Sequence, residues 1–248
     1  MGELSEWLRA FLRSGPWTPL LVRLKRLFVT PTSQNGEDAV LARLAQRYDA
    51  PRLFVELGYG GWEFNCASLA EAGWGGLLVD NDQYSRIVAT TLYSPKVETR
   101  RMWVNLDNIA EIARWVDGRP LGVLSIDVDG NDYWFLDRLL ALRPAIICCE
   151  YNSAIGMRSL TVPYDAGFFA YDKGQHPHYN FQGASLAALV KLAEAAGYRL
   201  VEQLAGINAF FVRDDLIDNQ PLPSPDEIYE PRLVEQWAEL RDLPWEKV

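Results

Sequence analysis

The chain has 248 residues, of which 49% are hydrophobic and 12% aromatic, and it carries a formal net charge of −9. This composition is sufficient to bury a complete core and excludes a disordered or fibrous protein. The acidic balance argues against nucleic acid as a partner, because phosphate binding requires clustered Lys and Arg.

Neither a signal peptide nor a membrane-spanning segment is predicted, because no apolar run approaches the roughly 18 residues that a bilayer demands. We therefore expect a cytoplasmic protein without an integral membrane segment. The cysteines agree with this expectation, since Cys66 stands alone and Cys148 and Cys149 are adjacent within an apolar run. Neither spacing is typical of a zinc site or a disulfide framework.

Residues 1–32 are predicted to form a helical extension that contains the basic cluster of the chain. Within it, Arg23, Lys25 and Arg26 alternate with apolar residues in the segment RLKRLF. Two interpretations are open. An amphipathic helix of this kind can contact a membrane or a partner, whereas apolar stripes at helical spacing more commonly pack on their own domain.

Residues 33–215 are predicted to form one domain in which strands and helices alternate. The assignments rest on apolar runs of strand length and on apolar residues at helical spacing that stop at glycines. Asn105 or Asp107 is expected to cap the helix predicted at 106–116. In chain order we expect a strand at 52–60, helix 64–73, strands 75–82 and 97–104, helix 106–116, strand 122–128, helix 133–142, strand 144–151, helix 185–197, and strands 198–204 and 208–213.

The runs at 122–128 and 144–151 are almost continuously apolar, as in strands that are covered on both faces. Strands separated by helices of this length predict a mostly parallel, doubly wound sheet, and the last two strands predict an antiparallel pair at its edge. The expected fold is therefore α/β and Rossmann-like, with the seven-stranded plan of class I methyltransferases. Residues 216–248 are expected to form a C-terminal tail that packs on this domain.

The first two strands of the predicted sheet end in residues that suit a nucleoside ligand. Glu56 is followed by Gly58, Tyr59 and Gly60, a turn that departs from G-x-G-x-x-G and so favours a ligand with a cationic amino group over a pyrophosphate. Asp80 follows the glycines by 20 to 22 residues, a position where an acid accepts both hydroxyls of a ribose.

We expect Glu56, Gly58, Tyr59, Gly60, Asp80 and the adjacent Asn81 to bind an adenosine-containing cofactor. The alternative is that the two acids are only solvated strand ends and the glycines only form turns.

Polar residues also follow the fourth and fifth strands, whose ends are neighbours in a parallel sheet. Asp127 or Asp129 can therefore face Glu150 and Asn152, and such oxygen ligands suit Mg²⁺ or another hard divalent cation. We predict a metal site of Asp127, Glu150 and Asn152, with Asp127 also acting in catalysis. Asp127 can instead bind the cofactor's methionine part without a metal.

Two residues in the same segment have a different expected role. Asn131 and Asp132 are predicted to cap the following helix, where acids and amides are common at the first turn.

The polar stretch 163–185 contains the two histidines of the chain, His176 and His178. It is either a lid over the acceptor, with His176 or His178 as the group that takes the hydroxyl proton, or a surface loop without a catalytic role. Aromatic-rich loops of this length in compact domains are often functional, but the sequence singles out neither histidine. Both interpretations therefore stay open.

Seven segments together resemble the FkbM-like S-adenosylmethionine-dependent methyltransferases. They follow one another in the family's order between residues 33 and 213, and they are SQNGEDAVL, FVELGYG, LLVDND, LSIDVDGNDYW, EYN, GASLAALVKLAEAAGY and NAFFVR. The resemblance implies a class I fold and methyl transfer, usually to oxygen.

The resemblance also implies roles for single residues. Glu56, Gly58 and Gly60 would line the methionine and adenosine site, and Asp80 would hold the ribose. The segment around Gln34, Asn35 and Glu37 would close over the cofactor from the N-terminal side.

The sequence therefore predicts an S-adenosylmethionine-dependent methyltransferase that methylates an oxygen of a small hydroxylated acceptor, such as a sugar or secondary metabolite, with or without a divalent metal. A homo-oligomer is compatible with this prediction. A non-catalytic module that binds an adenosine ligand is the main alternative, and an NAD-linked dehydrogenase is a weaker one.

Overall fold

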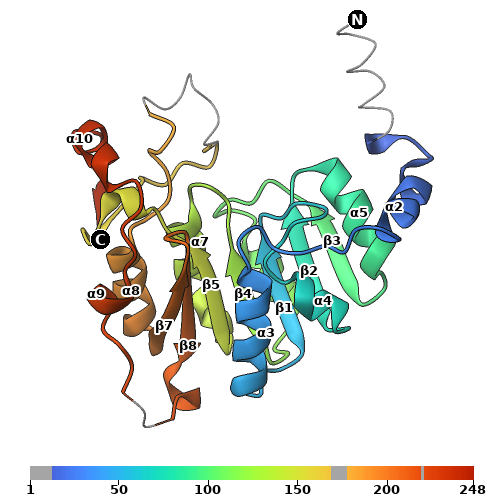
Figure 1. Cartoon of the computed structure of the whole chain (residues 1–248), viewed down its shortest axis with the longest axis horizontal. Helices are drawn as coiled ribbons and strands as arrows, with labels where there is room; N and C mark the ends of the chain where they lie inside the picture. The colour runs from blue at the N-terminus through green and yellow to red at the C-terminus, as the bar shows by residue number, and fades with distance from the viewer. Residues whose placement is uncertain (1–12, 169–177, 219–220) are drawn as a thin grey trace, which may run out of the picture.

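A computed structural model of the chain describes residues 13–168, 178–218 and 221–248 (Figure 1). Its centre is a seven-stranded sheet with the order β3-β2-β1-β4-β5-β8-β7. Strands β1 to β5 are parallel, and β8 is antiparallel to both β5 and β7. The strands are β1 (Leu53–Leu57), β2 (Gly75–Asp80), β3 (Val97–Arg101), β4 (Val123–Ile126), β5 (Ile146–Glu150), β7 (Tyr198–Leu204) and β8 (Asn208–Arg213).

This topology confirms the predicted fold class. The chain has the α/β, Rossmann-like, mostly parallel sheet that is closed by an antiparallel pair, as in class I methyltransferases.

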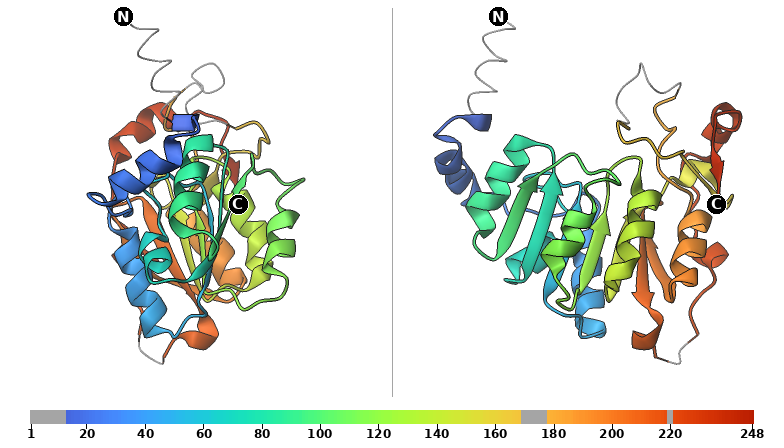
Figure 2. Two further views of the ribbon diagram at one scale, coloured as in Figure 1. Left: turned by 90° about the vertical axis from the view of Figure 1, so that its right-hand side faces the viewer. Right: turned by 180° about the vertical axis from the view of Figure 1, so that it is seen from behind.

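Helices cover both faces of the sheet, and the left view of Figure 2 shows the two layers on either side of it. One face packs against α3 (Glu37–Arg47), α4 (Ala67–Glu71) and α5 (Gln83–Tyr93). The other packs against α6 (Ala110–Val116), α7 (Asp132–Leu139) and α8 (Leu186–Ala195). Because both faces are covered, the central strands β1, β2, β4 and β5 are buried almost throughout.

Strand alternation divides the core into these two layers. Phe54 and Leu78 pack on the α3–α4 side, whereas Val55 and Leu77 pack on the α6–α7 side. The cysteines are buried in the same core.

The structure contains two long helices that the sequence patterns did not indicate, α3 and α5. Helix α5 begins after Asp82, whose side chain accepts the backbone N–H of Ser85. The cap predicted for α6 is wrong, because the helix begins at Ala110, four residues later than expected. The Asn105 side chain instead accepts the N–H groups of Asp107 and Asn108 in the preceding turn.

Helix α2 (Thr18–Arg26) lies beside α5 at the edge of the molecule (Figures 1 and 2). Thr18 and Val22 are buried, so one side of this helix packs on the domain. None of the described helices is both long and apolar enough to cross a membrane.

The C-terminal residues 221–248 contain α9 (Pro225–Ile228), α10 (Trp237–Leu240) and β9 (Glu246–Lys247). Strand β9 pairs with β6 (Leu160–Thr161) in a separate two-stranded sheet. Leu240 is fully buried with Val162 and Phe181, so this segment packs on the loops that follow β5.

Candidate active site

A cavity of about 610 Å³ opens at the carboxyl ends of the parallel strands. Ligands of α/β proteins bind at this edge of the sheet. Every residue predicted to bind the cofactor lines it: Gln34, Glu56, Gly58, Tyr59, Gly60, Asp80, Asn81 and Asp127. The lining also includes residues that the sequence did not single out, namely Asn65, Met102, Trp103, Val104 and Phe168.

The glycine turn after β1 fits tightly against the turn after β4. Gly58 has a φ of +75°, and a Cβ atom there would lie 1.7 Å from the carbonyl oxygen of Asp127. The Gly60 N–H donates to the Glu63 carbonyl at 2.8 Å and so closes the turn. Gly58 is therefore required both by its left-handed backbone and by the approach of β4.

Glu56 holds the start of α4. Its two carboxylate oxygens accept the backbone N–H groups of Asn65 and Cys66, each at 2.7 Å. Burial raises the pKa of Glu56 to about 7. Because both oxygens have protein partners, an additional contact of Glu56 with a cofactor stays a prediction.

Asp80 lies at the end of β2 with both carboxylate oxygens at the rim of the cavity. One oxygen accepts the Asp82 N–H at 2.6 Å, and the other accepts the Tyr59 N–H at 3.4 Å. Burial raises the pKa of Asp80 above its ordinary value. A carboxylate has further lone pairs, so these contacts orient Asp80 and leave it able to accept hydrogen bonds from a ligand.

The hydroxyl of Tyr59 is buried and has no hydrogen-bond partner among the described residues. The side chain is 7% exposed, and burial raises its pKa above the ordinary value. A buried hydroxyl without a partner is costly, so this atom marks a position where a ligand can supply the missing partner.

Aromatic and apolar side chains form the opposite wall of the cavity. Met102 and Trp103 follow β3, and the Trp103 indole N–H donates to the Ala166 carbonyl at 2.8 Å. Phe168 covers Gly130 so closely that a Cβ there would lie 2.2 Å from the Phe168 ring. These contacts bring the loop after β6 against the turn after β4.

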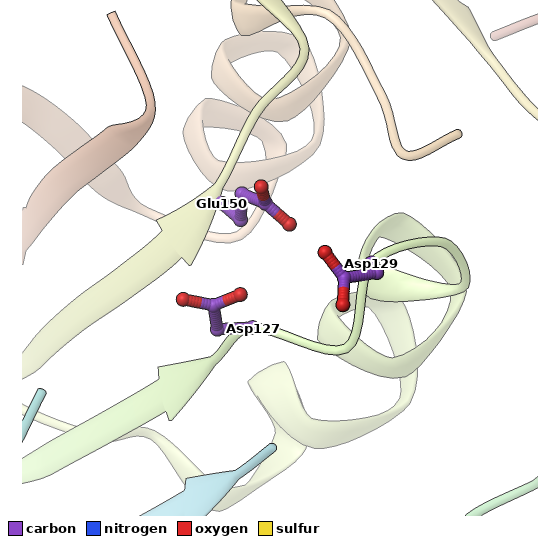
Figure 3. Close-up of side chains that lie close together, drawn as sticks. All are labelled: Asp127, Asp129 and Glu150. Carbon is purple, nitrogen blue, oxygen red and sulfur yellow. The ribbon is translucent and has the colours of Figure 1, made fainter. Parts of the chain in front are cut away.

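Three carboxylates meet at the mouth of the sheet. Oxygens of Asp127, Asp129 and Glu150 all lie within 4.8 Å of one another, and Figure 3 shows the three side chains facing a common space. Asp127 follows β4 and Glu150 is the last residue of β5, and these two strands are neighbours in the sheet. Within residues 13–168, 178–218 and 221–248, no ion pair includes any of the three.

The electrostatic environment of this carboxylate cluster favours its protonated or cation-bound form. Burial and the neighbouring acids raise the pKa of Asp127 to about 8 and that of Glu150 well above its ordinary value. Burial, followed by the charge of Asp80, also raises the pKa of Asp129. Three adjacent carboxylates cannot all be ionised without a compensating cation, except at a large cost in free energy.

The side chains of Asn131 and Asp132 bind backbone groups of loops and do not cap α7. The Asp132 side chain accepts the N–H groups of Val128 and Gly130 at 2.9 and 2.8 Å. Asn131 stands at the N-cap position without a capping bond, and its amide donates to the Asp165 carbonyl at 2.8 Å. The predicted side-chain capping is therefore wrong, because both side chains bind loop backbone.

The Asn152 side chain also forms hydrogen bonds with loop backbone. Its amide oxygen accepts the Ala154 N–H, and its amide nitrogen donates to the carbonyls of Asn180 and Gln182. The structure thus brings Asp129 to Asp127 and Glu150, and it engages the Asn152 side chain elsewhere.

His178 does not line the cavity. Its Nδ1 accepts the Asn180 N–H at 3.1 Å, and its Nε2 lies 3.2 Å from a carboxylate oxygen of Glu239. Both ring nitrogens therefore have partners in the loop and the C-terminal segment. His176, the second histidine predicted as a base, lies outside the described residues.

The segment that precedes α3 reaches the cavity through Gln34. Glu37 is buried behind it, where its carboxylate accepts hydrogen bonds from Asn35 and from the Asn208 amide. Glu37 therefore fixes this segment to β8.

Comparison with protein-family models and with curated proteins finds no match to this chain. Among solved structures, the N-terminal domain of EvdMO1 with SAH bound is 16% identical, with a TM-score of 0.46 over 73% of this chain and 80% of that one. The bifunctional kinase-methyltransferase WbdD is 16% identical, with a TM-score of 0.42 over 71% of this chain and 39% of that one. YjhP from E. coli is also 16% identical, with a TM-score of 0.36 over 67% of this chain and 65% of that one.

Proposed function

We propose that this protein is an S-adenosylmethionine-dependent methyltransferase that methylates a hydroxyl oxygen of a small acceptor, such as a sugar or secondary metabolite. One observation carries the proposal. A single cavity is lined by the glycine turn and Asp80 and also by Asp127 and Asp129, two members of the carboxylate cluster. The strand order of class I methyltransferases supports it.

The residues around the glycine turn suit this cofactor. Asp80 can accept hydrogen bonds from ribose hydroxyls, and Asn81 lies next to it at the rim. Met102 and Trp103 offer apolar surface to an adenine ring. The unpartnered hydroxyl of Tyr59 offers a polar contact that no described residue fills. When bound, S-adenosylmethionine supplies a methyl group on a positively charged sulfur.

The carboxylate cluster suits the acceptor side. Methyl transfer requires an oxygen positioned in line with the methyl carbon, and the proton of the hydroxyl must be taken up. In the cation-free site, the ionised form of Asp127 can take up this proton, the role that the sequence suggested for the histidines. Because its pKa is raised to about 8, that form becomes the main one only above about pH 8. Phe168 lies against Gly130 and offers apolar surface next to this part of the cavity, which would help to keep water from the reacting atoms.

The same cluster suits a divalent cation of the Mg²⁺ type. Asp127, Asp129 and Glu150 provide three hard oxygen ligands, and among the described residues no Cys or His belongs to this group. A cation held there would neutralise the cluster and lower the pKa of an acceptor hydroxyl. In this proposal Asp129 replaces Asn152 in the predicted ligand set.

Calorimetric titration with S-adenosylmethionine, followed by a methyl-transfer assay over hydroxylated acceptors, tests the function. Tyr59→Phe should weaken cofactor binding about fivefold to tenfold without lowering the melting temperature, because it removes a buried hydroxyl that lacks a protein partner. Tyr198→Phe is the matched control. The Tyr198 hydroxyl donates to the Pro144 carbonyl at 2.9 Å, so its loss should lower stability and leave binding unchanged.

The possible results separate the alternatives. Absence of S-adenosylmethionine binding would refute the proposal, and tight binding without transfer to any acceptor would favour a non-catalytic binding module. Activity that survives EDTA without loss would contradict the cation while leaving methyl transfer in place.

A further inference from the structure

Helix α2 has apolar side chains on two opposite sides, and the domain covers only one of them. Thr18 and Val22 face the domain and are buried. In a helix with 3.6 residues per turn, Leu20 and Leu24 lie roughly 160° around the axis from Val22, on the far side. We call the exposed apolar residues on and just after this side the outer ridge: Trp17, Leu20, Leu24, Leu27 and Phe28.

The outer ridge consists of large apolar side chains that are largely exposed to solvent. Phe28 is 87% exposed, Trp17 62% and Leu24 50%. Single apolar residues on a surface need no explanation, but a contiguous group of large ones marks an interaction site.

Side-chain contacts on the inner side hold α2 in this position. Arg26 forms an ion pair with Glu71 at 2.5 Å, and the Lys25 ammonium lies 4.3 Å from the centre of the Trp62 ring. The exposure of the outer ridge therefore occurs on a helix that is docked to the domain through its other side.

Charge is segregated in the same part of the chain. Residues 13–36 contain Arg13, Arg23, Lys25 and Arg26 and no Asp or Glu, although the whole chain has a formal net charge of −9. Arg23 flanks the outer ridge on an exposed position of α2. An apolar ridge flanked by the exposed cation of Arg23, on a protein that is acidic as a whole, complements a surface that is both apolar and anionic.

We infer that the outer ridge of α2 binds the surface of a lipid bilayer that contains anionic headgroups. Leu24 and Phe28 enter the acyl boundary, Trp17 lies at the headgroup level, and Arg23 contacts the headgroups. A second copy of the chain fits less well, because pairing two outer ridges would bring Arg23 of both copies together, and residues 13–36 contain no Asp or Glu to neutralise them.

Docking in this way would hold the cavity close to the bilayer. Lys25 contacts Trp62, and the Trp62 indole N–H donates to the Tyr84 hydroxyl in α5. Trp62 follows the glycine turn, so the packed side of α2 touches residues next to the cofactor side of the cavity. The inference does not depend on the proposed function.

Co-sedimentation of the full chain with vesicles tests the inference. We expect binding to vesicles of phosphatidylcholine and phosphatidylglycerol at roughly two to one, weaker binding to phosphatidylcholine alone, and release by salt. The double substitution Leu24→Gln and Phe28→Gln should lower the partition coefficient at least about tenfold. Arg23→Gln should lower it about fivefold.

Matched exposed sites serve as controls. Val234, 43% exposed in the C-terminal segment, and Lys191, exposed on α8, lie outside the outer ridge. Val234→Gln and Lys191→Gln should leave the partition coefficient unchanged. Melting temperatures within experimental error of the wild type would show that the α2 variants are folded.

Two results would overturn the inference. One is absence of binding to the anionic vesicles, or binding that the α2 variants do not reduce. The other is a concentration-dependent dimer in light scattering that the Leu24→Gln and Phe28→Gln substitutions abolish, because the outer ridge would then be an interface between copies.

Discussion

Replacing Asp129 with Asn should stabilise the protein while it impairs the proposed reaction. Each carboxylate pair in the cluster lies within 4.8 Å, and two full charges at that distance repel by about 3 kcal/mol at an effective dielectric constant of about 20. Protons shared by Asp127 and Glu150 relieve part of this repulsion, so we expect a gain of about 1–3 kcal/mol at pH near 8. The substitution introduces no backbone strain, because Asn tolerates the φ of +58° at this position as well as Asp does.

Urea unfolding in the presence of EDTA measures this gain, and Asp132→Asn is the matched control. Asp132 is also buried and acidic, but its two oxygens accept the N–H groups of Val128 and Gly130. An amide retains only one acceptor oxygen, so Asp132→Asn should lower the free energy of unfolding by about 1–3 kcal/mol. Two acid-to-amide changes three residues apart should therefore have opposite effects on stability.

An Asp129→Asn protein that is less stable than the wild type would refute the reasoning, because the three carboxylates would then be stabilising one another. Added Mn²⁺ gives a second measurement. It should raise the melting temperature of the wild type more than that of Asp129→Asn, since a ligand that binds the folded state stabilises it in proportion to its affinity. Equal shifts would count against a cation in the cluster.

Three further predictions concern residues at or near the carboxyl ends of β1 and β2. Gly58→Ala should lower the free energy of unfolding by more than about 3 kcal/mol in denaturant titrations, because the added Cβ would lie 1.7 Å from the Asp127 carbonyl oxygen. The buried Glu56, with a pKa raised to about 7, keeps a proton that the unfolded chain has lost, so stability should fall as the pH rises from about 5 to 8, by up to about 3 kcal/mol. Thermal melts of Glu56→Gln, which cannot titrate, should show a smaller fall over the same range. Asp80→Asn should weaken S-adenosylmethionine binding about tenfold in calorimetry, and unchanged affinity would contradict its proposed contact with the ribose.

The centre of the sheet could be predicted because β4 and β5 are nearly continuous apolar runs, and such runs become strands covered on both faces. The proximity of Asp127 and Glu150 follows from the same pattern. Consecutive parallel strands that are neighbours place their last residues side by side, and the structure brings these two carboxylates together.

Helix α5 could have been predicted from its N-cap residue, although its apolar residues do not follow a regular helical spacing. Its first turn is polar, Thr90 and Thr91 interrupt its apolar spacing, and yet Asp82 forms a regular N-cap with Ser85. The cap was therefore the better indication of this helix than its hydrophobic periodicity.

The walls of the cavity could not be predicted, because tertiary packing brings them together. Trp103 and Phe168 are far apart in the sequence and line the same cavity, where Trp103 contacts Ala166 and Phe168 contacts Gly130. Asn131 shows the same limit for a local rule. Asn131 occupies the expected N-cap position, but its side chain forms hydrogen bonds with the backbone of Asp165 in a distant loop and not with the helix.

The carboxylate cluster differs from the other buried acids in the partners of its oxygen atoms. Glu56 and Asp132 each receive two backbone N–H groups, and Glu37 receives three hydrogen bonds from Asn35 and Asn208. The chain thus supplies donors to acids that hold its turns in place. At the mouth of the sheet it places Asp127, Asp129 and Glu150 against one another, without an ion pair to any described Lys or Arg. Such an arrangement lowers stability unless a proton, a cation or an acceptor hydroxyl completes it, which is the property expected of a site selected for chemistry.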